Sequence, residues 1–101
     1  MTRASIRIIK NGEEDLYFYS HCDGYPTGLL VDLIHMKNKD NYNNFIETMR
    51  KNYEEIYRHP GDIDFSYVID FDKEKIFTYT DREAHLVRID LLDTNVIEIE
   101  K

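Results

Sequence analysis

The apolar residues of one central segment recur with the spacing of an α-helix. They are Tyr42, Phe45, Ile46, Met49, Tyr53, Ile56 and Tyr57. Residues three or four positions apart share one side of a helix, so this stripe predicts an amphipathic helix that packs on the rest of the fold. Asp40 or Asn41 can cap its first turn through a side-chain oxygen. The dipeptide Pro60-Gly61 is expected to end it.

The segments on both sides of this stripe have strand patterns: most alternate between apolar and polar residues, which is typical of half-buried β-strands, and the segment 16–19 is rich in aromatic residues. These segments are 4–10, 16–19, 65–70, 76–80, 85–92 and 96–100. A shorter helix is predicted from Thr27 to Lys37, with Thr27 as its N-cap. Because strands and helices are segregated along the chain, we predict an α+β fold with the order ββ-αα-ββ(ββ). In this fold, two helices cover one face of an antiparallel sheet of four to six strands.

The first two strands are predicted to form a hairpin, because Asn11-Gly12 is a strong signal for a tight turn. Two registers are open. A two-residue loop would place Ile8 opposite Asp15, whereas one further loop residue would place Ile8 opposite Leu16 and improve the apolar match. The sequence does not choose between them.

The second strand has aromatic residues on both of its faces. Tyr17 and Tyr19 point away from Leu16 and Phe18, because successive residues of a strand alternate. Both faces of the sheet are therefore expected to be covered, by the helices on one side and by a second subunit of a homodimer on the other. In the alternative interpretation, the tyrosine hydroxyl groups reach solvent.

Composition limits the compartment and the class of partner. The 101 residues are expected to form a single domain over 1–101. Cys22 is the only cysteine, which favours a reducing compartment, the cytoplasm. No apolar run is long enough for a membrane span. A net charge of −7 argues against direct binding to nucleic acid or anionic lipid, and it suits a basic protein surface or simple solubility.

The segment 21–28, which reads HCDGYPTG, has several interpretations. In the structural one, the Asp23 side chain accepts a backbone N–H bond, and Gly24 has a positive φ or a close backbone contact. A nucleophilic role for Cys22 is disfavoured, because an adjacent His21 in an extended chain would point to the opposite side. A metal site is disfavoured as well, because the histidines lack ligand spacing. We therefore expect no catalytic residue, metal or cofactor.

A binding role for the same segment is the remaining interpretation. Its polar side chains precede a helix N-terminus, where backbone N–H groups suit a phosphate or a carboxylate. Acidic clusters and amphipathic tyrosines elsewhere could form a docking surface for a protein. The predicted binding residues are His21, Asp23, Tyr25 and Thr27 in the segment, with Tyr17, Tyr19, Glu54 and Glu55 outside it.

The chain also resembles a group of short proteins found largely in phages, prophages and other mobile elements. These proteins carry a His-x-Asp-Gly-Tyr-Pro-x-Gly segment after two strands, which residues 21–28 match. The sequence SYVIDFDKEK at 66–75 is similar to their later hairpin. The resemblance covers roughly half of the chain. It implies a mobile-element setting, in which small acidic proteins often bind and block a host defence protein.

Together these observations predict a small acidic protein that is not an enzyme and that captures or inhibits a host factor in the host cytosol. One alternative is a module that binds a small-molecule ligand through the 21–28 loop. A third is an enzyme whose site follows no recognised pattern. These three hypotheses require different side chains to lie close together, and the fold determines which side chains do so.

Overall fold

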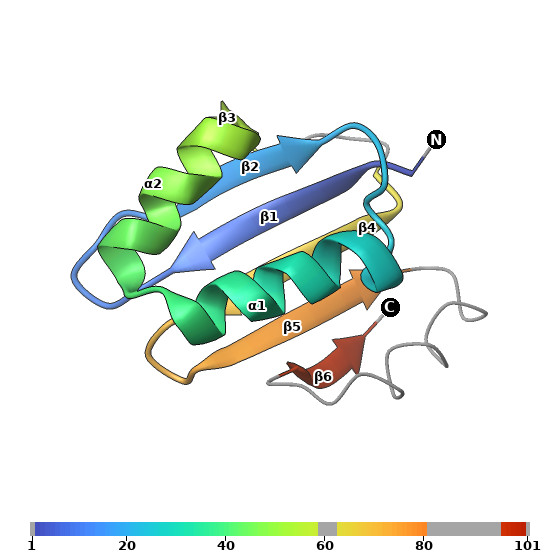
Figure 1. Ribbon diagram of the computed structural model, residues 1–101. Coiled ribbons are helices and arrows are strands. Elements are labelled where there is room, and N and C mark those ends of the chain that lie inside the picture. The colour runs from blue at the N-terminus through green and yellow to red at the C-terminus, as the bar shows by residue number, and fades with distance from the viewer. Residues whose placement is uncertain (1, 59–62, 81–95, 101) are drawn as a thin grey trace.

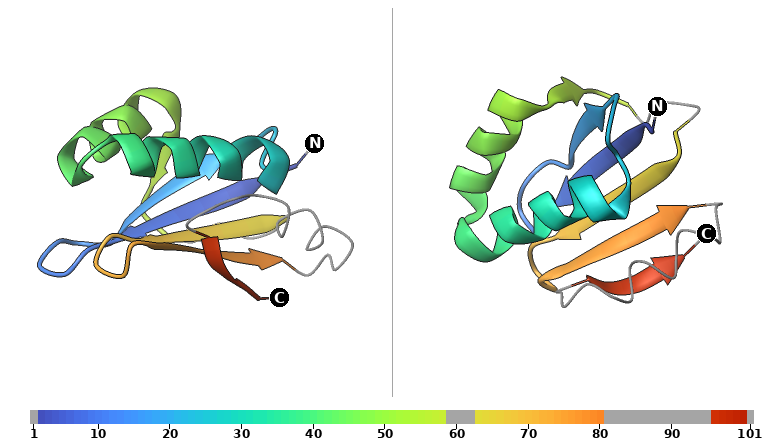
Figure 2. Two further views of the ribbon diagram at one scale, coloured as in Figure 1. Left: turned by 60° about the horizontal axis from the view of Figure 1, so that its bottom comes forward. Right: turned by 45° about the vertical axis from the view of Figure 1, so that its right-hand side comes forward.

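The computed structural model describes residues 2–58, 63–80 and 96–100, and it has a six-stranded sheet in the order β3-β2-β1-β4-β5-β6. The strands are β1 (Ala4–Ile9), β2 (Leu16–Ser20), β3 (Glu54–Ile56), β4 (Phe65–Asp70), β5 (Lys75–Thr80) and β6 (Val96–Glu100). The helices are α1 (Val31–Lys39), which continues the π-helical turn η1 (Pro26–Leu30), and α2 (Tyr42–Asn52). Both α-helices lie over the same face of the sheet (Figures 1 and 2). The predicted α+β class and the two helices on one face are confirmed.

The sheet is mixed, so the prediction of an antiparallel sheet is wrong. β1 pairs antiparallel with β2 but parallel with β4, and β5 pairs parallel with β6. A parallel pair needs a long crossover connection, and the segment that carries both helices supplies it between β1 and β4. The strand predicted within 85–92 lies outside the described residues, whereas the predicted last strand is β6 at the sheet edge.

The second helix is shorter than the apolar stripe predicts. α2 ends at Asn52, and Tyr53 already has an extended backbone, with φ −133° and ψ 155°. The next residues form β3, which pairs antiparallel with β2. Hydrogen bonds to the open outer edge of β2 replace those that a longer helix would have made. Tyr53 still packs against the core, but Tyr57 is 91% exposed.

The two helix starts differ in how well the sequence predicts them. The Asn41 side chain accepts a hydrogen bond from the Asn44 backbone N–H at 2.9 Å, so the predicted cap of α2 is confirmed. The predicted Thr27 cap is wrong, because the helical segment begins earlier, at Pro26, without a side-chain cap. The proline ring fixes a helical φ at this first position, where the missing N–H has no cost.

The first hairpin takes the register with the longer loop. Ile8 lies opposite Leu16, and Ile6 lies opposite Phe18. The turn is closed by a bond from the Glu13 N–H to the Lys10 carbonyl at 3.0 Å, and Gly12 has φ +86°. The observed register is therefore the one with the better apolar match across the strands, and one additional loop residue accommodates it.

The core lies between the sheet and the helices. Its members are Ala4, Ile6, Ile8, Phe18, Leu29, Leu30, Leu33, Ile34, Phe45, Ile46, Met49, Phe65, Tyr67, Ile69 and Ile76. Tyr67 is the polar exception among its largest fully buried aromatic side chains, and its hydroxyl donates to the Gly24 carbonyl at 2.7 Å. Burial raises the pKa of Tyr67, so the hydroxyl remains a donor. This bond fastens the 21–28 segment to the centre of the sheet.

We expect Tyr67→Phe to lower the free energy of unfolding by about 1–2 kcal/mol, because the buried Gly24 carbonyl would lose its partner. Urea denaturation followed by circular dichroism measures the change. Tyr57→Phe is the matched control, since the Tyr57 side chain is exposed. Equal stability of the two variants would contradict a structural role for this bond.

Candidate functional site

The 21–28 segment is a tightly packed turn. The Gly24 N–H donates to the Thr2 carbonyl at 3.0 Å, and an added Cβ would lie 2.8 Å from the Ala4 Cβ. The predicted close backbone contact at Gly24 is thus confirmed. The residue with a left-handed backbone is Asp23, with φ +57°. A short polar side chain such as that of aspartate tolerates this conformation.

The polar side chains that were predicted to form a site in this segment bond locally. Asp23 Oδ1 accepts a hydrogen bond from the Tyr25 hydroxyl at 3.0 Å, in place of the predicted backbone N–H. His21 Nδ1 lies 2.9 Å from the Tyr19 hydroxyl. Cys22 is a free, exposed cysteine, and Thr27 is exposed. The geometry therefore accounts for most of the segment through packing and local bonds.

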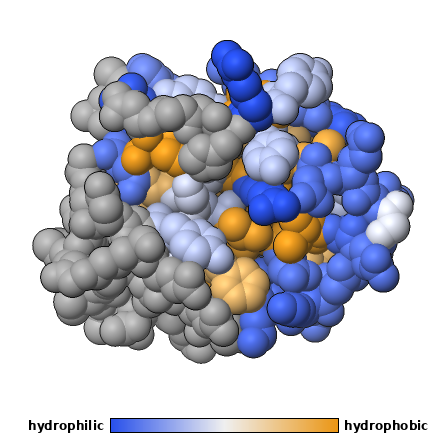
Figure 3. Space-filling model, turned by 180° about the vertical axis from the view of Figure 1, so that it is seen from behind, coloured by the Kyte–Doolittle hydropathy of each residue, from blue (hydrophilic) through white to orange (hydrophobic). Residues whose placement is uncertain are grey.

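A row of side chains crosses five strands on the face of the sheet opposite the helices. The pairing register aligns Ile56, Tyr17, Arg7, Val68 and Phe77 from β3 to β5. A parallel row aligns Glu54, Tyr19, Ser5, Ser66 and Tyr79. We call these two rows the open face. Neither helix covers these two rows (Figure 2), and apolar and hydrophilic side chains lie side by side on the coloured part of this face (Figure 3).

Arg7 carries the positive charge at the centre of the open face. Its Nε donates to Asp15 Oδ2 at 3.1 Å, and one of its terminal nitrogens pairs with the same oxygen. The guanidinium carbon lies 5.8 Å from the centre of the Tyr17 ring. The bond to Asp15 raises the pKa of Arg7, so the group stays charged. The open face thus presents a fixed guanidinium, paired with the Asp15 carboxylate, among aromatic and aliphatic side chains.

The structure brings some of the predicted partner-binding residues together and separates others. Tyr17, Tyr19 and Glu54 lie on the open face. Glu55 alternates to the helix side, where it accepts a bond from Arg50 Nε at 3.1 Å. The two glutamates therefore do not share one docking surface, because they are successive residues of a strand and point to opposite sides of the sheet.

Several residues of the open face were not predicted as part of a site. They are Arg7, Ile56, Val68, Phe77 and Tyr79. The strand patterns of β1, β4 and β5 were the available signal for a second apolar face, whereas Ile56 continues a helical spacing and gave no such signal. The order of the strands, which the alternation does not encode, was needed to place them side by side.

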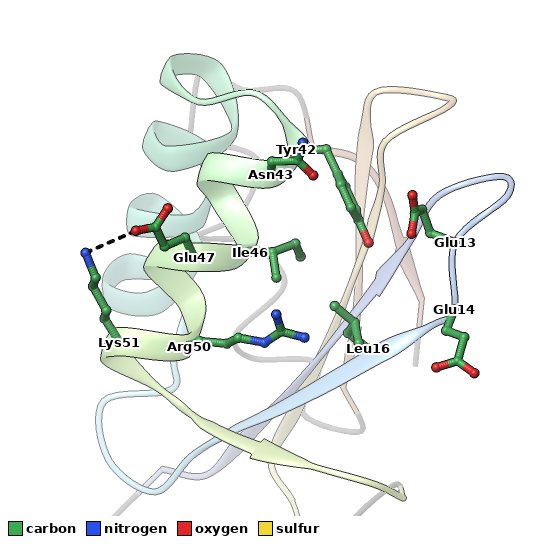
Figure 4. A pocket seen from close by; sticks show the side chains of 9 residues that line it. All are labelled: Glu13, Glu14, Leu16, Tyr42, Asn43, Ile46, Glu47, Arg50 and Lys51. Atoms are coloured by element: carbon green, nitrogen blue, oxygen red, sulfur yellow. Dashed lines mark ion pairs between the residues drawn. The ribbon is translucent and has the colours of Figure 1, made fainter.

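A cavity of about 560 Å³ lies between α2 and the loop of the first hairpin (Figure 4). It is lined by Glu13, Glu14, Leu16, Tyr42, Asn43, Ile46, Glu47, Arg50 and Lys51. Lys51 Nζ pairs with Glu47 at 3.5 Å on the side of the helix away from the hairpin. This cavity could not be predicted from the sequence. One wall belongs to the first hairpin and the other to α2, and only the tertiary fold brings the two segments together.

No protein-family model, curated protein or solved structure matches this chain. Among residues 2–58, 63–80 and 96–100, no group of three or more His, Cys, Asp or Glu side chains is placed to hold a metal ion. Within the same ranges, no helix has the length and apolar character needed to cross a membrane. The open face and the cavity are the features of the described structure on which a function can rest.

Proposed function

We propose that this protein acts by binding another protein through the open face, and that it captures or inhibits a host factor in the cytoplasm without catalysing a reaction. The observation that carries this proposal is the row from Ile56 to Phe77. It places aliphatic and aromatic groups around one fixed guanidinium, across five adjacent strands. The resemblance to proteins of phages and mobile elements is the reason to seek the partner in a host cell.

The chemistry of the row suits a protein interface. Tyrosine and arginine are enriched among the residues that dominate binding energy, since each combines a large contact area with a hydrogen-bonding group. Tyr17 is half-buried already, and Arg7 is held over its ring, so little side-chain freedom remains to be lost on binding. The acidic remainder of the surface would accelerate the approach of a basic partner.

We expect Tyr17→Ala to weaken the complex by about tenfold to a hundredfold, as is typical of a residue at the centre of an interface. A protein captured from host lysate by the immobilised wild type is purified, and its affinity for each variant is measured by calorimetry. Tyr57→Ala is the matched control, because Tyr57 is an exposed tyrosine outside the open face. Circular dichroism verifies that both variants fold.

Equal affinities of Tyr17→Ala and Tyr57→Ala would contradict the proposal. Sedimentation of the free proteins separates a second outcome, in which the open face is covered by another copy of this chain. In that case the wild type sediments as a dimer and Tyr17→Ala as a monomer. A homodimer would then take the place of the host factor as the partner of the open face.

A further inference from the structure

The cavity beside α2 has an apolar floor between an acidic wall from the hairpin loop and a wall from α2 that carries Arg50. Leu16 and Ile46 form the floor, and the Tyr42 ring stands at one end (Figure 4). Glu13 and Glu14 line the wall that comes from the hairpin loop, and Arg50 extends from α2 on the other side. A ligand in this cavity would therefore meet the Glu13 carboxylate near Tyr42, an apolar surface and a guanidinium, with the Glu14 carboxylate further along the same loop.

Arg50 is the cation that faces the cavity. Its Nε donates to Glu55 Oε1 at 3.1 Å, which fixes the plane of the guanidinium. The rest of the guanidinium points toward Leu16, and the described residues give its terminal nitrogens no further bond. Lys51 is directed away and pairs with Glu47. The paired donors of a fixed guanidinium match a carboxylate, which can accept two parallel bonds.

The Tyr42 ring at the aromatic end of the cavity is positioned by contacts with two neighbouring side chains. The Tyr42 ring makes an edge-to-face contact with Phe71, with 5.2 Å between the ring centres, and Lys10 Nζ lies 5.8 Å from the centre of the Tyr42 ring. Partial burial and the neighbouring Glu13 carboxylate raise the pKa of Tyr42. The phenol therefore stays neutral and offers a hydroxyl group to a ligand.

We propose that this cavity binds a short peptide through both of its free ends. The peptide carboxylate accepts bonds from Arg50, its ammonium group lies against Glu13 and Glu14, and its apolar side chains rest on the floor. A volume of about 560 Å³ lies in the range of small-molecule sites and exceeds what a single amino acid fills. A purely anionic ligand would be repelled by Glu13 and Glu14, and a purely cationic ligand would be repelled by Arg50. The proposal is independent of the open face.

The test compares three dipeptides that differ only in their terminal charges. Leucylleucine is titrated into the ¹⁵N-labelled protein, followed by its N-acetylated form and its C-terminal amide. We expect leucylleucine to shift the amide signals around the cavity with a dissociation constant at or below about 1 mM. Removal of either charge should weaken binding by about tenfold or more, because each charge contributes charge-assisted hydrogen bonds.

Protein variants test which side chains bind each terminal charge of the dipeptide. In Arg50→Gln, leucylleucine and its amide should bind equally, whereas the acetylated form should still bind more weakly. In the double variant Glu13→Gln and Glu14→Gln, acetylation should lose its effect. Lys39→Gln, at the exposed end of α1, is the control for loss of a positive charge and should bind as the wild type does.

The amide spectrum of each variant verifies the fold before titration, and the loop variants keep the proposal testable if Arg50→Gln alters α2. The proposal is overturned if leucylleucine produces no saturable shifts at the cavity. It is also overturned if both capped forms bind as tightly as the free dipeptide, or if Arg50→Gln and Lys39→Gln behave alike.

Discussion

Replacing Phe45 by alanine is expected to lower the free energy of unfolding by about 3–5 kcal/mol. Phe45 is fully buried on the sheet side of α2, and its ring makes an edge-to-face contact with Phe71 at 5.2 Å between centres. Truncation removes the transfer free energy of the ring and leaves a cavity that the flanking sheet cannot close completely. The change is measured by urea denaturation.

Asn43→Ala is the matched control for Phe45→Ala, because Asn43 lies exposed on the same helix. Its effect should stay within about 0.5 kcal/mol, as at other surface positions. A loss of similar size in Phe45→Ala would place Phe45 outside the core. The assignment of the buried side of α2 would then be wrong.

Gly24→Ala is expected to cost about 1–3 kcal/mol, the usual result of inserting a methyl group into a filled space. The new Cβ would lie 2.8 Å from the Ala4 Cβ and 3.0 Å from the Thr2 carbonyl oxygen. The segment cannot move away freely, because the Gly24 carbonyl is bonded to the buried Tyr67 hydroxyl. Thermal denaturation compared with the wild type measures the loss.

A second substitution tests the cause assigned to the Gly24 effect. Ala4→Gly removes the nearest obstructing atom, so the double variant Ala4→Gly with Gly24→Ala should be less destabilised than the sum of the two single changes. Additive effects would show that the methyl group and Ala4 do not compete for space. An unchanged melting temperature in Gly24→Ala itself would contradict the close packing of the segment.

Local patterns in the sequence were sufficient for the parts of the fold that depend on near neighbours. The Asn41 cap, the buried position of Phe45 and the two-faced aromatic strand at 16–19 all follow from the spacing of adjacent residues. β3 was missed because Ile56 and Tyr57 continue a helical spacing. Only the tertiary contact with the free edge of β2 favours an extended backbone there.

The candidate sites depended more on tertiary structure than the elements did. Tyr17 and Tyr19 could be assigned to a second sheet face from alternation alone. The alignment of Arg7 with Val68 and Phe77 requires the parallel pairing of β1 with β4, which no short-range pattern encodes. The cavity likewise needs the hairpin loop and Arg50 of α2 to be brought together. The 21–28 motif, by contrast, owes most of its unusual composition to packing.

The parallel pairing at the centre of the sheet also constrains the order in which the chain can fold. Ala4 pairs with Phe65, and the Arg3 N–H donates to Asp64, which lies 61 positions later in the chain. Closing so long a loop costs entropy before any contact of the pair offsets it. The β1–β2 hairpin needs only local contacts, so it can form first. One edge of β1 then remains unpaired until the ribosome has released the chain as far as β4.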